Sequence, residues 1–559
     1  MQTEPAGEAL TNAGEEVAHG APTRAPTPAL DNATVATERH GAGSSALGTR
    51  AACACALFSG ILYFLSFPTV DAWPLAFVAW VPLLVAIRGR TTRRTVILGC
   101  VAGFTTNVAG FYWLQSMLRT FSGFSPVFCF FFVLILCAYQ GARTAFLAWL
   151  YGRGTARGWP AAPVFAAAFV ASEVVYPVLF PWYFAASVHQ VPLLLQVAEL
   201  GGPIAVGLVL VAVNLALAEL VLARVARRRV TAGTVAAGVA ALGVSLAYGA
   251  SRVGAVDADA RAAPKATVGV VQANMGLLEK RNSFDEGLQR HLRASDALFR
   301  GGADFVVWSE TSVMRPVMDD RYTQDLGRVA RAVAGPAVFG AVIVKPVSDA
   351  RRYAFFNSAV SSTADGAVIT RYDKQFLLPF GEYIPFGRQF PSLYELSPNS
   401  GRFEPGTSLD PLTLRLHGED HAVTMLICYE DILPEFTNRS VDRGNPDLLV
   451  NITNDAWFGD TPEPWQHLAL AQLRAVEHRR FFVRGTNSGV SAVIDPVGRV
   501  VAHTSSFKQE TIAAPVHFMR TKTIYERIGD APWFGVALAS AIAAFVRRPA
   551  RRRGSTASV

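Results

Sequence analysis

Met425-Leu426-Ile427-Cys428-Tyr429-Glu430-Asp431 is an apolar run that ends in a cysteine, a tyrosine and two carboxylates. The apolar part is typical of a buried strand, so Cys428 is expected where that strand leaves its sheet. Functional sites of α/β folds usually lie at such strand ends. Considered alone, a cysteine in this setting is more often a packed core thiol than a nucleophile.

Similar short apolar runs, broken by Gly, Pro and Asn, fill the region from about 255 to 528. They are Thr267–Gln272, Phe305–Trp308, Val338–Val344, Val423–Ile427, Leu448–Ile452 and Val490–Ile494, with a helical pattern over Gln466–Arg480. This alternation predicts an α/β sandwich with buried sheets. The sequence contains no glycine-rich phosphate loop, which argues against a nucleotide-dependent reaction.

Charged residues are sparse on both sides of this region. They make up 17% of the chain, against about 25% in ordinary soluble proteins. A membrane-spanning helix needs about 20 mainly apolar residues. Candidates lie near 51–69, 74–88, 95–114, 125–150, 161–180, 196–223, 230–250 and 531–547. We therefore predict a multi-spanning helical membrane domain over 51–250 with about seven helices, an extramembrane domain over 255–528 and a closing membrane helix over 531–547. Residues 1–50 are predicted to form a disordered tail.

Basic residues follow the positive-inside rule. They gather in the connections at 89–94, 152–158 and 224–229 and in the tail 548–559, whereas 70–73, 115–124 and 181–192 contain only Arg119 among Lys and Arg. With a cytoplasmic N-terminus and an odd number of helices before residue 255, this places the 255–528 domain outside the cytoplasm and the basic tail inside it. An even number with a cytoplasmic domain is the alternative.

The formal net charge of +8 raises the question of a nucleic-acid partner. The basic residues flank apolar stretches rather than forming a basic-aromatic module, so we expect no nucleic-acid binding. Five of the six cysteines lie in apolar stretches, and only Cys428 belongs to the 255–528 domain. That domain can therefore form neither an internal disulfide nor a cysteine-based zinc site.

Two further segments place an ionisable group where a strand should end. Phe305-Val306-Val307-Trp308-Ser309-Glu310 ends in a carboxylate, and Tyr372-Asp373-Lys374 ends in a lysine. Alone, Glu310 is more often a solvated or capping residue and Lys374 a surface lysine. Together with Cys428 they supply what thiol chemistry on an acyl group requires, namely a nucleophile, a base and a cation for the developing oxyanion.

The order Glu310, Lys374, Cys428 resembles the Glu-Lys-Cys triad of the nitrilase superfamily of carbon–nitrogen hydrolases. Longer stretches are similar to one membrane branch of that superfamily, the apolipoprotein N-acyltransferases. These stretches are Tyr372-Asp373-Lys374, Leu378-Pro379-Phe380-Gly381-Glu382-Tyr383-Ile384-Pro385, Cys428-Tyr429-Glu430 and Asn451-Ile452-Thr453-Asn454-Asp455-Ala456-Trp457-Phe458-Gly459. The resemblance implies a nitrilase-like αββα sandwich as the extramembrane domain, attached to the helical membrane domain.

The resemblance also implies roles for individual residues. Cys428 would be the nucleophile, Glu310 the general base and Lys374 a stabiliser of the tetrahedral intermediate, with the backbone N–H of Tyr429 as a second donor. Glu382 and Glu430 match further acidic positions of the family, which would orient Lys374 and shape the charge around the thiol; an ordinary surface salt bridge is the alternative. Tyr429 and Trp457 match pocket-wall or lid residues. Asn451 and Asn454 are interpreted as loop-structuring residues.

The implied reaction moves an acyl chain from a membrane phospholipid to Cys428 as a thioester. The α-amino group of a diacylglyceryl-cysteine on a lipoprotein then takes the acyl chain as an amide. The resemblance implies no metal and no organic cofactor, and we expect a monomer in a bacterial inner membrane with its catalytic domain on the periplasmic side. A membrane-anchored amidase of the nitrilase type, and a degenerate binding module on a helical bundle, remain the alternatives.

Two details stay open at this level. The residues around Phe380, Phe386, Phe390, Leu393 and Trp457–Phe458 are either loops that touch lipid or core packing. Arg281 stands where the family usually has Trp, which bears on how the substrate head is held.

Overall fold

The computed structural model describes residues 47–276, 283–348, 352–397 and 400–549. The described residues do not include Arg281, most of the predicted tail 1–50 or the end of the predicted basic tail. The helical block comprises α1 (Thr49–Leu65), η1 (Trp73–Phe77), α2 (Val81–Ile87), α3 (Thr92–Gly110), α4 (Leu114–Ser122), α5 (Pro126–Ala156), α6 (Ala161–Val175), η2 (Phe184–Val188), α7 (Pro192–Leu195), α8 (Ala198–Val225), α9 (Ala232–Ala262) and, from the C-terminal end, α17 (Ala531–Phe545).

Helices occupy each of the eight ranges that the sequence marks as apolar. Among the described residues, α5, α8 and α9 are long and apolar enough to cross a membrane. The bent pair of α3 and α4 adds a fourth span if the pair counts as one. The remaining apolar helices, α1, η1 with α2, α6 and α17, are shorter. The number of spans therefore stays a prediction.

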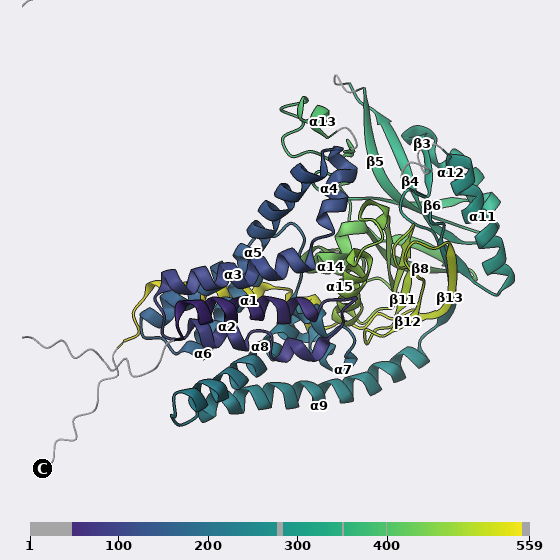
Figure 1. Cartoon of the computed structure of the whole chain (residues 1–559). Coiled ribbons are helices and arrows are strands. Elements are labelled where there is room, and N and C mark those ends of the chain that lie inside the picture. The colour runs from purple at the N-terminus through teal and green to yellow at the C-terminus, as the bar shows by residue number, and fades with distance from the viewer. Residues whose placement is uncertain (1–46, 277–282, 349–351, 398–399, 550–559) are drawn as a thin grey trace, which may run out of the picture. The chain divides into compact units, whose positions relative to one another are not determined.

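The last helix before the sheets extends past the predicted end of the helical block. The block was expected to end at 250, and α9 continues to Ala262 before β1 starts at Lys265. The added segment is polar, with Asp257, Asp259 and Arg261, so apolar content alone could not reveal that the helix continues. In Figure 1, α9 runs alongside the helical block and leads into the sheets.

Close backbone packing holds the centre of the helical block together. A Cβ atom added to Gly103 of α3 would lie 2.1 Å from the carbonyl oxygen of Gly141 on α5. Small residues allow this approach, which favours helix association in lipid. Beyond Gly110 the chain bends by 61° into α4.

The region from Lys265 to Ile528 is built on two mixed sheets. Its elements are β1 (Lys265–Gln272), α11 (Phe284–Arg300), β2 (Phe305–Val307), β3 (Val313–Met318), η3 (Asp319–Arg321), α12 (Tyr322–Val333), β4 (Ala337–Pro346), β5 (Tyr353–Ser362), β6 (Val368–Asp373), α13 (Leu393–Leu396), β7 (Leu412–Leu416), β8 (Glu419–Ile427), η4 (Cys428–Ile432), α14 (Pro434–Gly444), β9 (Leu448–Thr453), η5 (Asp455–Trp457), α15 (Glu463–His478), β10 (Phe482–Thr486), β11 (Ala492–Ile494), β12 (Val500–His503), β13 (Glu510–His517) and α16 (Ile524–Ile528).

Among the described residues the first sheet has the order β13-β1-β2-β4-β5-β6, with β3 beside β4, and the second has the order β12-β11-β10-β9-β8-β7. Each has a parallel centre, β1-β2-β4 in the first and β8-β9-β10 in the second. Helices α11 and α12 contact the first sheet and α14 and α15 the second, while β1 contacts β10 between them. This αββα arrangement confirms the predicted fold class (Figure 1).

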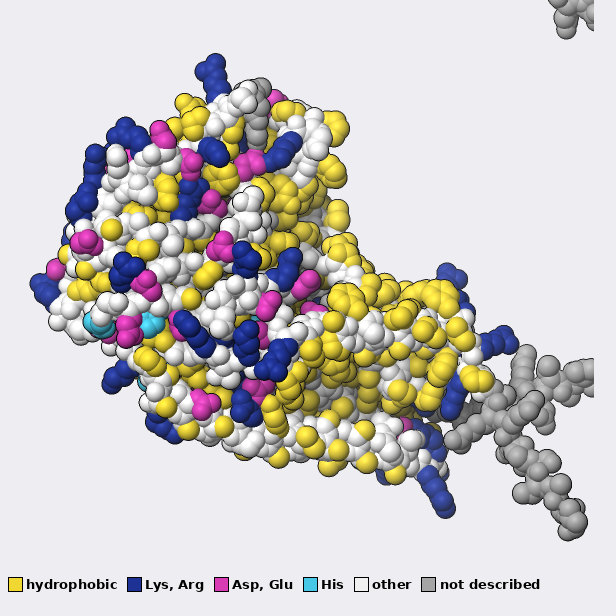
Figure 2. All heavy atoms as spheres, turned by 180° about the vertical axis from the view of Figure 1, so that it is seen from behind, with side chains coloured by type: hydrophobic (Ala, Val, Ile, Leu, Met, Phe, Trp, Pro, Cys, Tyr) yellow, Lys and Arg dark blue, Asp and Glu magenta, His cyan; other side chains and the backbone are white. Residues whose placement is uncertain are grey.

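The surface of the helical block differs from that of the sheets. Figure 2 shows hydrophobic side chains gathered over the block and Lys and Arg side chains at its end away from the sheets. Exposed apolar residues include Phe128, Phe131 and Ile135 of α5, Val239 and Val244 of α9, and Leu538 and Phe545 of α17. An apolar band of this kind fits a lipid environment.

Candidate active site

Cys428 occupies a sharp turn between β8 and η4. Its φ of +54° lies in the left-handed region, which costs a non-glycine residue about 1–3 kcal/mol. The turn is held in place because Asn451 Nδ2 donates to the carbonyl oxygens of Leu426 and Cys428, both at 3.2 Å. The thiol is thereby placed at the strand end, where it lines a cavity although the residue is only 6% exposed.

Glu310, which follows β2, and Lys374, which follows β6, lie near each other in the same buried cluster. Lys374 Nζ lies 3.5 Å from Glu310 Oε1 and 2.7 Å from Glu382 Oε2. Asn357 of β5 links the two carboxylates, since its Nδ2 donates to Glu310 Oε1 at 2.5 Å and to Glu382 Oε1 at 2.8 Å. Glu382 is therefore a largely enclosed partner of the buried Lys374, with its side chain 12% exposed, and the pair is not an ordinary surface salt bridge.

The electrostatics of this cluster keep Cys428 protonated at rest. Burial raises the pKa of the Cys428 thiol well above its usual range, Glu310 raises it further, and Lys374 lowers it. Burial acts against the charge on Lys374, but Glu382, then Cys428 and Glu310, outweigh it and raise the pKa of Lys374. The lysine is thus a permanent cation, and the thiol needs a base before it can act as a nucleophile.

Glu430 does not contact the Lys374 side chain and instead joins two loops. Its Oε1 accepts hydrogen bonds from the backbone N–H groups of Gln375 at 2.7 Å and Phe376 at 3.0 Å, and its Oε2 from that of Ile427 at 2.7 Å. The Tyr372 hydroxyl adds a donor at 3.0 Å from each oxygen. Burial raises the pKa of Glu430 to about 7, against the effect of these hydrogen bonds. The carboxylate thereby fixes the segment after Lys374 against the turn that carries Cys428.

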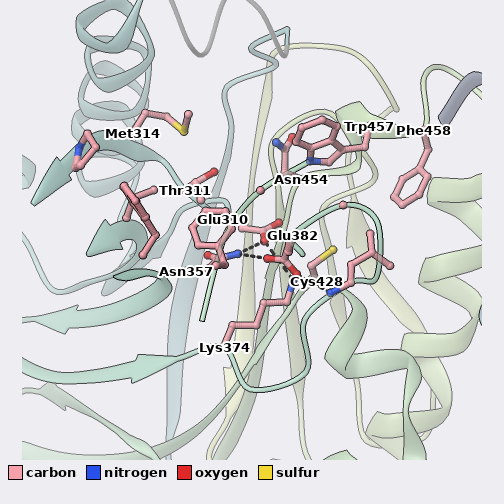
Figure 3. A pocket seen from close by; sticks show the side chains of 17 residues that line it. Glu310, Thr311, Met314, Asn357, Lys374, Glu382, Cys428, Asn454, Trp457 and Phe458 are labelled. Atoms are coloured by element: carbon pink, nitrogen blue, oxygen red, sulfur yellow. Dashed lines mark hydrogen bonds and ion pairs between the residues drawn. The ribbon is translucent and has the colours of Figure 1, made fainter. Parts of the chain in front are cut away.

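A cavity of about 280 Å³ opens onto this cluster. Figure 3 shows Glu310, Lys374, Glu382 and Cys428 around its floor, with Trp457, Phe458 and Asn454 on one side and Met314 and Thr311 on the other. Most of its wall is apolar, including Pro316, Val342, Phe355, Leu378 and Phe403. An apolar chamber with a few convergent polar groups suits a long-chain substrate.

Of the two predicted pocket-wall residues, Trp457 lines this cavity and the Tyr429 side chain does not. Tyr429 lines a smaller cavity that shares Cys428, Leu378 and Phe458 with the larger one, and its hydroxyl donates to the backbone carbonyl oxygen of Leu179 in the helical block. Lipid contact and core packing were both open for a group of aromatic residues. Phe380, Phe386 and Phe390 are exposed and so are not core residues, whereas Phe458 is buried.

A buried charge network lies behind the Cys428 turn. Arg484 donates to Asp431 Oδ2 and Asp455 Oδ2, both at 3.0 Å, and to Asn451 Oδ1 at 2.8 Å. Asp455, Glu463 and His467 offer atoms that lie within 4.8 Å of one another and could hold a metal ion. Because Arg484 already supplies a cation to Asp455, we assign these residues to the network around the turn.

Comparisons with known proteins follow the same division of the chain. The family described as apolipoprotein N-acyltransferase N-terminal domain matches residues 59–216, and the carbon-nitrogen hydrolase family matches 267–525. An apolipoprotein N-acyltransferase of Geobacter metallireducens is 30% identical over 88% of this chain and 95% of its own length. One from Pseudomonas putida is 31% identical over 84% and 92%. The chain belongs to the apolipoprotein N-acyltransferase family.

An enzyme of this family acts in lipoprotein maturation as an N-acyltransferase, and this confirms the predicted class of activity and the membrane setting. Among solved structures, an amidase from Nesterenkonia sp. AN1 is similar at 18% identity, covering 48% of this chain and 98% of the amidase with a TM-score of 0.34.

One site residue escaped sequence reasoning, and another lies in a different element from the one expected. Asn357 is a polar residue of β5 that was not considered, whereas Asn451, interpreted as loop-structuring, lies in the buried strand β9. A lone amide in a strand that is otherwise buried was the available signal, since such a group must find partners.

Proposed function

We propose that this acyltransferase works by a two-stage cycle on Cys428, with a membrane phospholipid as acyl donor and the α-amino group of a diacylated lipoprotein as acceptor. The observation that carries the proposal is the convergence of Glu310, Lys374 and Cys428 on one apolar cavity. Glu310 is the general base, and Lys374 stabilises the oxyanion.

In the first stage Glu310 takes the proton of Cys428, and the thiolate attacks the carbonyl carbon of a phospholipid ester. Negative charge then develops on the carbonyl oxygen of the ester. The Lys374 ammonium and the backbone N–H of Tyr429 stabilise this charge. The C–O bond breaks, and Glu310 returns the proton to the leaving lysophospholipid. A thioester on Cys428 remains.

In the second stage the lipoprotein amine attacks the thioester carbonyl. The C–S bond breaks, Glu310 carries a proton from nitrogen to sulfur, and an amide is released. Glu382 holds Lys374 in position through both stages by a direct ion pair. Asn357 holds Glu310 in position by a direct hydrogen bond and also bonds Glu382.

Lipid substrates fit the surroundings of the cavity. Phe380, Phe386 and Phe390 are exposed on the segment that follows Lys374, where they could enter the lipid surface. The basic side chains at the far end of the helical block support a cytoplasmic position for that end, with the catalytic domain on the opposite, periplasmic side of the inner membrane (Figure 2).

The test uses membranes that contain the full-length protein, labelled phospholipid and a diacylated lipopeptide. We expect acyl transfer to the lipopeptide, a thioester adduct on Cys428 by mass spectrometry after phospholipid alone, and loss of both in Cys428→Ala. Cys100→Ala changes an exposed cysteine of α3 and should retain activity. Hydrolysis of a small amide without transfer would favour an amidase, and turnover without a thioester would contradict the two-stage cycle.

A further inference from the structure

Gln140 is a buried amide near the middle of α5. Apolar residues fill this helix from Pro126 to Tyr139, directly before Gln140, and the helix is long and apolar enough to cross a membrane. Gln140 is 3% exposed. A polar side chain at such a position is costly unless it has partners, and it is often there for a functional reason. Its partners lie in the segment 176–183, which connects α6 to η2.

Gln140 makes three hydrogen bonds to the backbone of this segment. Its Oε1 accepts from the N–H groups of Leu179 at 2.8 Å and Phe180 at 3.2 Å, and its Nε2 donates to the carbonyl oxygen of Phe180 at 3.0 Å. These partners fix the orientation of the amide, because a flipped amide would turn its NH₂ group toward two N–H donors. Leu179 and Phe180 belong to no helix or strand, so the amide satisfies backbone groups that regular structure would otherwise pair.

The peptide unit that joins Leu179 to Phe180 is bonded on both sides. Its N–H donates to Gln140 Oε1, and its carbonyl oxygen accepts from the hydroxyl of Tyr429. The atoms of a peptide unit lie in one rigid plane, with the N–H and the C=O on opposite edges. Gln140 therefore sets the plane against which the Tyr429 side chain is held.

The ring of Phe180 makes a second contact with the same tyrosine. The Phe180 and Tyr429 rings pack edge-on with centroids 6.3 Å apart, and both residues line a cavity that also exposes Cys428. The proposed cycle uses the backbone N–H of Tyr429 as a donor to the oxyanion. Because such a donor works only when it is aimed at the developing charge, the orientation of Tyr429 bears on the rate of both stages.

Two other residues of α5 hold the same segment at different points. The Tyr139 hydroxyl donates to the carbonyl oxygen of Pro177 at 2.7 Å, and Arg143 Nη2 donates to that of Trp182 at 2.9 Å. Neither of these hydrogen bonds involves the peptide unit that meets Tyr429. The segment therefore keeps two attachments to α5 when Gln140 is replaced, and the local orientation of one peptide is what changes.

We propose that Gln140 is a positioning residue for catalysis. Through the peptide unit between Leu179 and Phe180 it holds Tyr429, and with it the backbone N–H beside Cys428, in the orientation that the oxyanion requires. This inference rests on the proposed two-stage cycle, in which that N–H is a donor. It gives the helical block a part in the rate of the chemical steps as well as in contact with lipid.

The test is a double-mutant cycle in the full-length protein. Gln140→Met keeps the length of the side chain and removes the amide, and Tyr429→Phe removes the hydroxyl. Loss of one hydrogen bond corresponds to a change in rate of about fivefold, so each single variant should lower kcat about fivefold with KM nearly unchanged. The double variant should be about as slow as either single variant, because both changes break the same connection.

The two stages are also measured separately. The enzyme is first loaded with labelled phospholipid and the thioester is quantified, and a diacylated lipopeptide is then added. Both stages place an oxyanion at the same N–H, so thioester formation and aminolysis should slow by the same factor in Gln140→Met.

Asn214 of α8 provides a matched control. It is a fully buried amide that accepts from the N–H of Trp80 at 2.8 Å and donates to the carbonyl oxygen of Ala76 at 2.8 Å, so it also joins a helix to the backbone of a neighbouring segment. Asn214→Leu should lower Tm about as much as Gln140→Met and leave kcat nearly unchanged.

Several outcomes would overturn the assignment. A double variant about 25-fold slower than the wild type, the product of two independent losses, would show that Gln140 does not act through Tyr429. Unchanged kcat in Gln140→Met, a loss confined to KM, or an equal loss of kcat in Asn214→Leu would do the same. Gln140→Glu retains an oxygen that can accept from Leu179 and Phe180 and should recover part of the rate. The same cycle with Gln140→Glu decides the question if Gln140→Met does not fold. Failure of the wild type to form a thioester would instead count against the two-stage cycle.

Discussion

The hydroxyl of Tyr429 donates a hydrogen bond to the backbone carbonyl oxygen of Leu179. The residue next to the nucleophile is thereby tied to the helical block, far away in sequence. Phe180, the neighbour of Leu179, also packs edge-on against the Tyr429 ring, with centroids 6.3 Å apart. The position of the catalytic turn therefore depends on the helical block.

Removal of this tie should slow catalysis without unfolding the protein. A hydrogen bond contributes about 1 kcal/mol, so we expect Tyr429→Phe to lower kcat about fivefold with little change in Tm. Acyl transfer from labelled phospholipid measures the effect. Tyr353→Phe, at an exposed position, serves as the matched control. Equal activity of the two variants would show that the turn holds its position without Leu179.

Loss of the Glu310 carboxylate should make the thiol more acidic while it stops turnover. Because Glu310 raises the pKa of Cys428, Glu310→Gln lowers that pKa, and the pH midpoint for alkylation of Cys428 by a maleimide moves downward. Turnover should fall by about 10²–10⁴-fold through loss of the general base. Intact-protein mass spectrometry follows the alkylation over a pH series, with Glu419→Gln as an exposed control. An upward move of the midpoint in Glu310→Gln would contradict this sign.

Replacement of Glu430 should destabilise the active site although it leaves the triad intact. In Glu430→Gln, an amide NH₂ group would face some of the N–H donors of Gln375, Phe376 and Ile427 that now meet a carboxylate. An unsatisfied buried donor costs about 1–3 kcal/mol. A thermal unfolding curve in detergent and an acyl-transfer assay should both show the loss. Retained stability would mean that these donors find other acceptors.

Asn357 should matter for rate rather than for substrate binding. Asn357→Ala removes the link between Glu310 and Glu382, so the base loses its orientation and kcat should fall by about tenfold or more, with KM nearly unchanged. Asn357→Asp places a third carboxylate beside these two and should be worse. Steady-state kinetics with both variants provides the measurement, and a change confined to KM would argue against an orienting role.

The buried Arg479 should be much costlier to remove than an exposed arginine. Its Nε lies 2.8 Å from Glu199 Oε2 of α8, and both residues are buried. Loss of one partner of a buried ion pair costs about 3–5 kcal/mol, so Arg479→Ala should lower Tm strongly. Arg415→Ala breaks an exposed pair with Asp420 and should cost less than about 1 kcal/mol. Similar Tm values for the two would refute the expected difference.

Most of the architecture could be predicted from the sequence because the signals for helices and strands are local. Apolar runs predicted β1, β2, β4, β8 and β9 to within a few residues, since burial on both faces leaves a near-continuous apolar pattern. The polar end of α9 was missed because it projects beyond the apolar part of the helix. Glu310, Lys374 and Cys428 could be placed at strand ends, but the sheet pairing that brings those ends together is a long-range property.

The supporting residues were harder to predict for the same reason. Asn357 and Arg484 act through contacts with residues far away in the chain, and nothing in their immediate neighbours indicates a partner. Glu430 was expected to orient Lys374 and shape the charge around the thiol, yet its hydrogen bonds come from three backbone N–H groups and the Tyr372 hydroxyl. Which atom a buried polar group meets is decided by the packed structure.

The bend between α3 and α4 has a consequence for the modularity of the protein. The carbonyl oxygen of Gly110 at the bend accepts a hydrogen bond from Gln466 Nε2 of α15 at 2.9 Å, and Gln466 Oε1 accepts one from Trp113 Nε1 at 3.1 Å. A side-chain amide of the catalytic half thus donates a hydrogen bond to a backbone carbonyl oxygen of the helical half. A chimera that joins this helical half to the hydrolase half of a distant relative would leave the bend unsatisfied, so the two halves are expected to be inherited, and to change, as a matched pair.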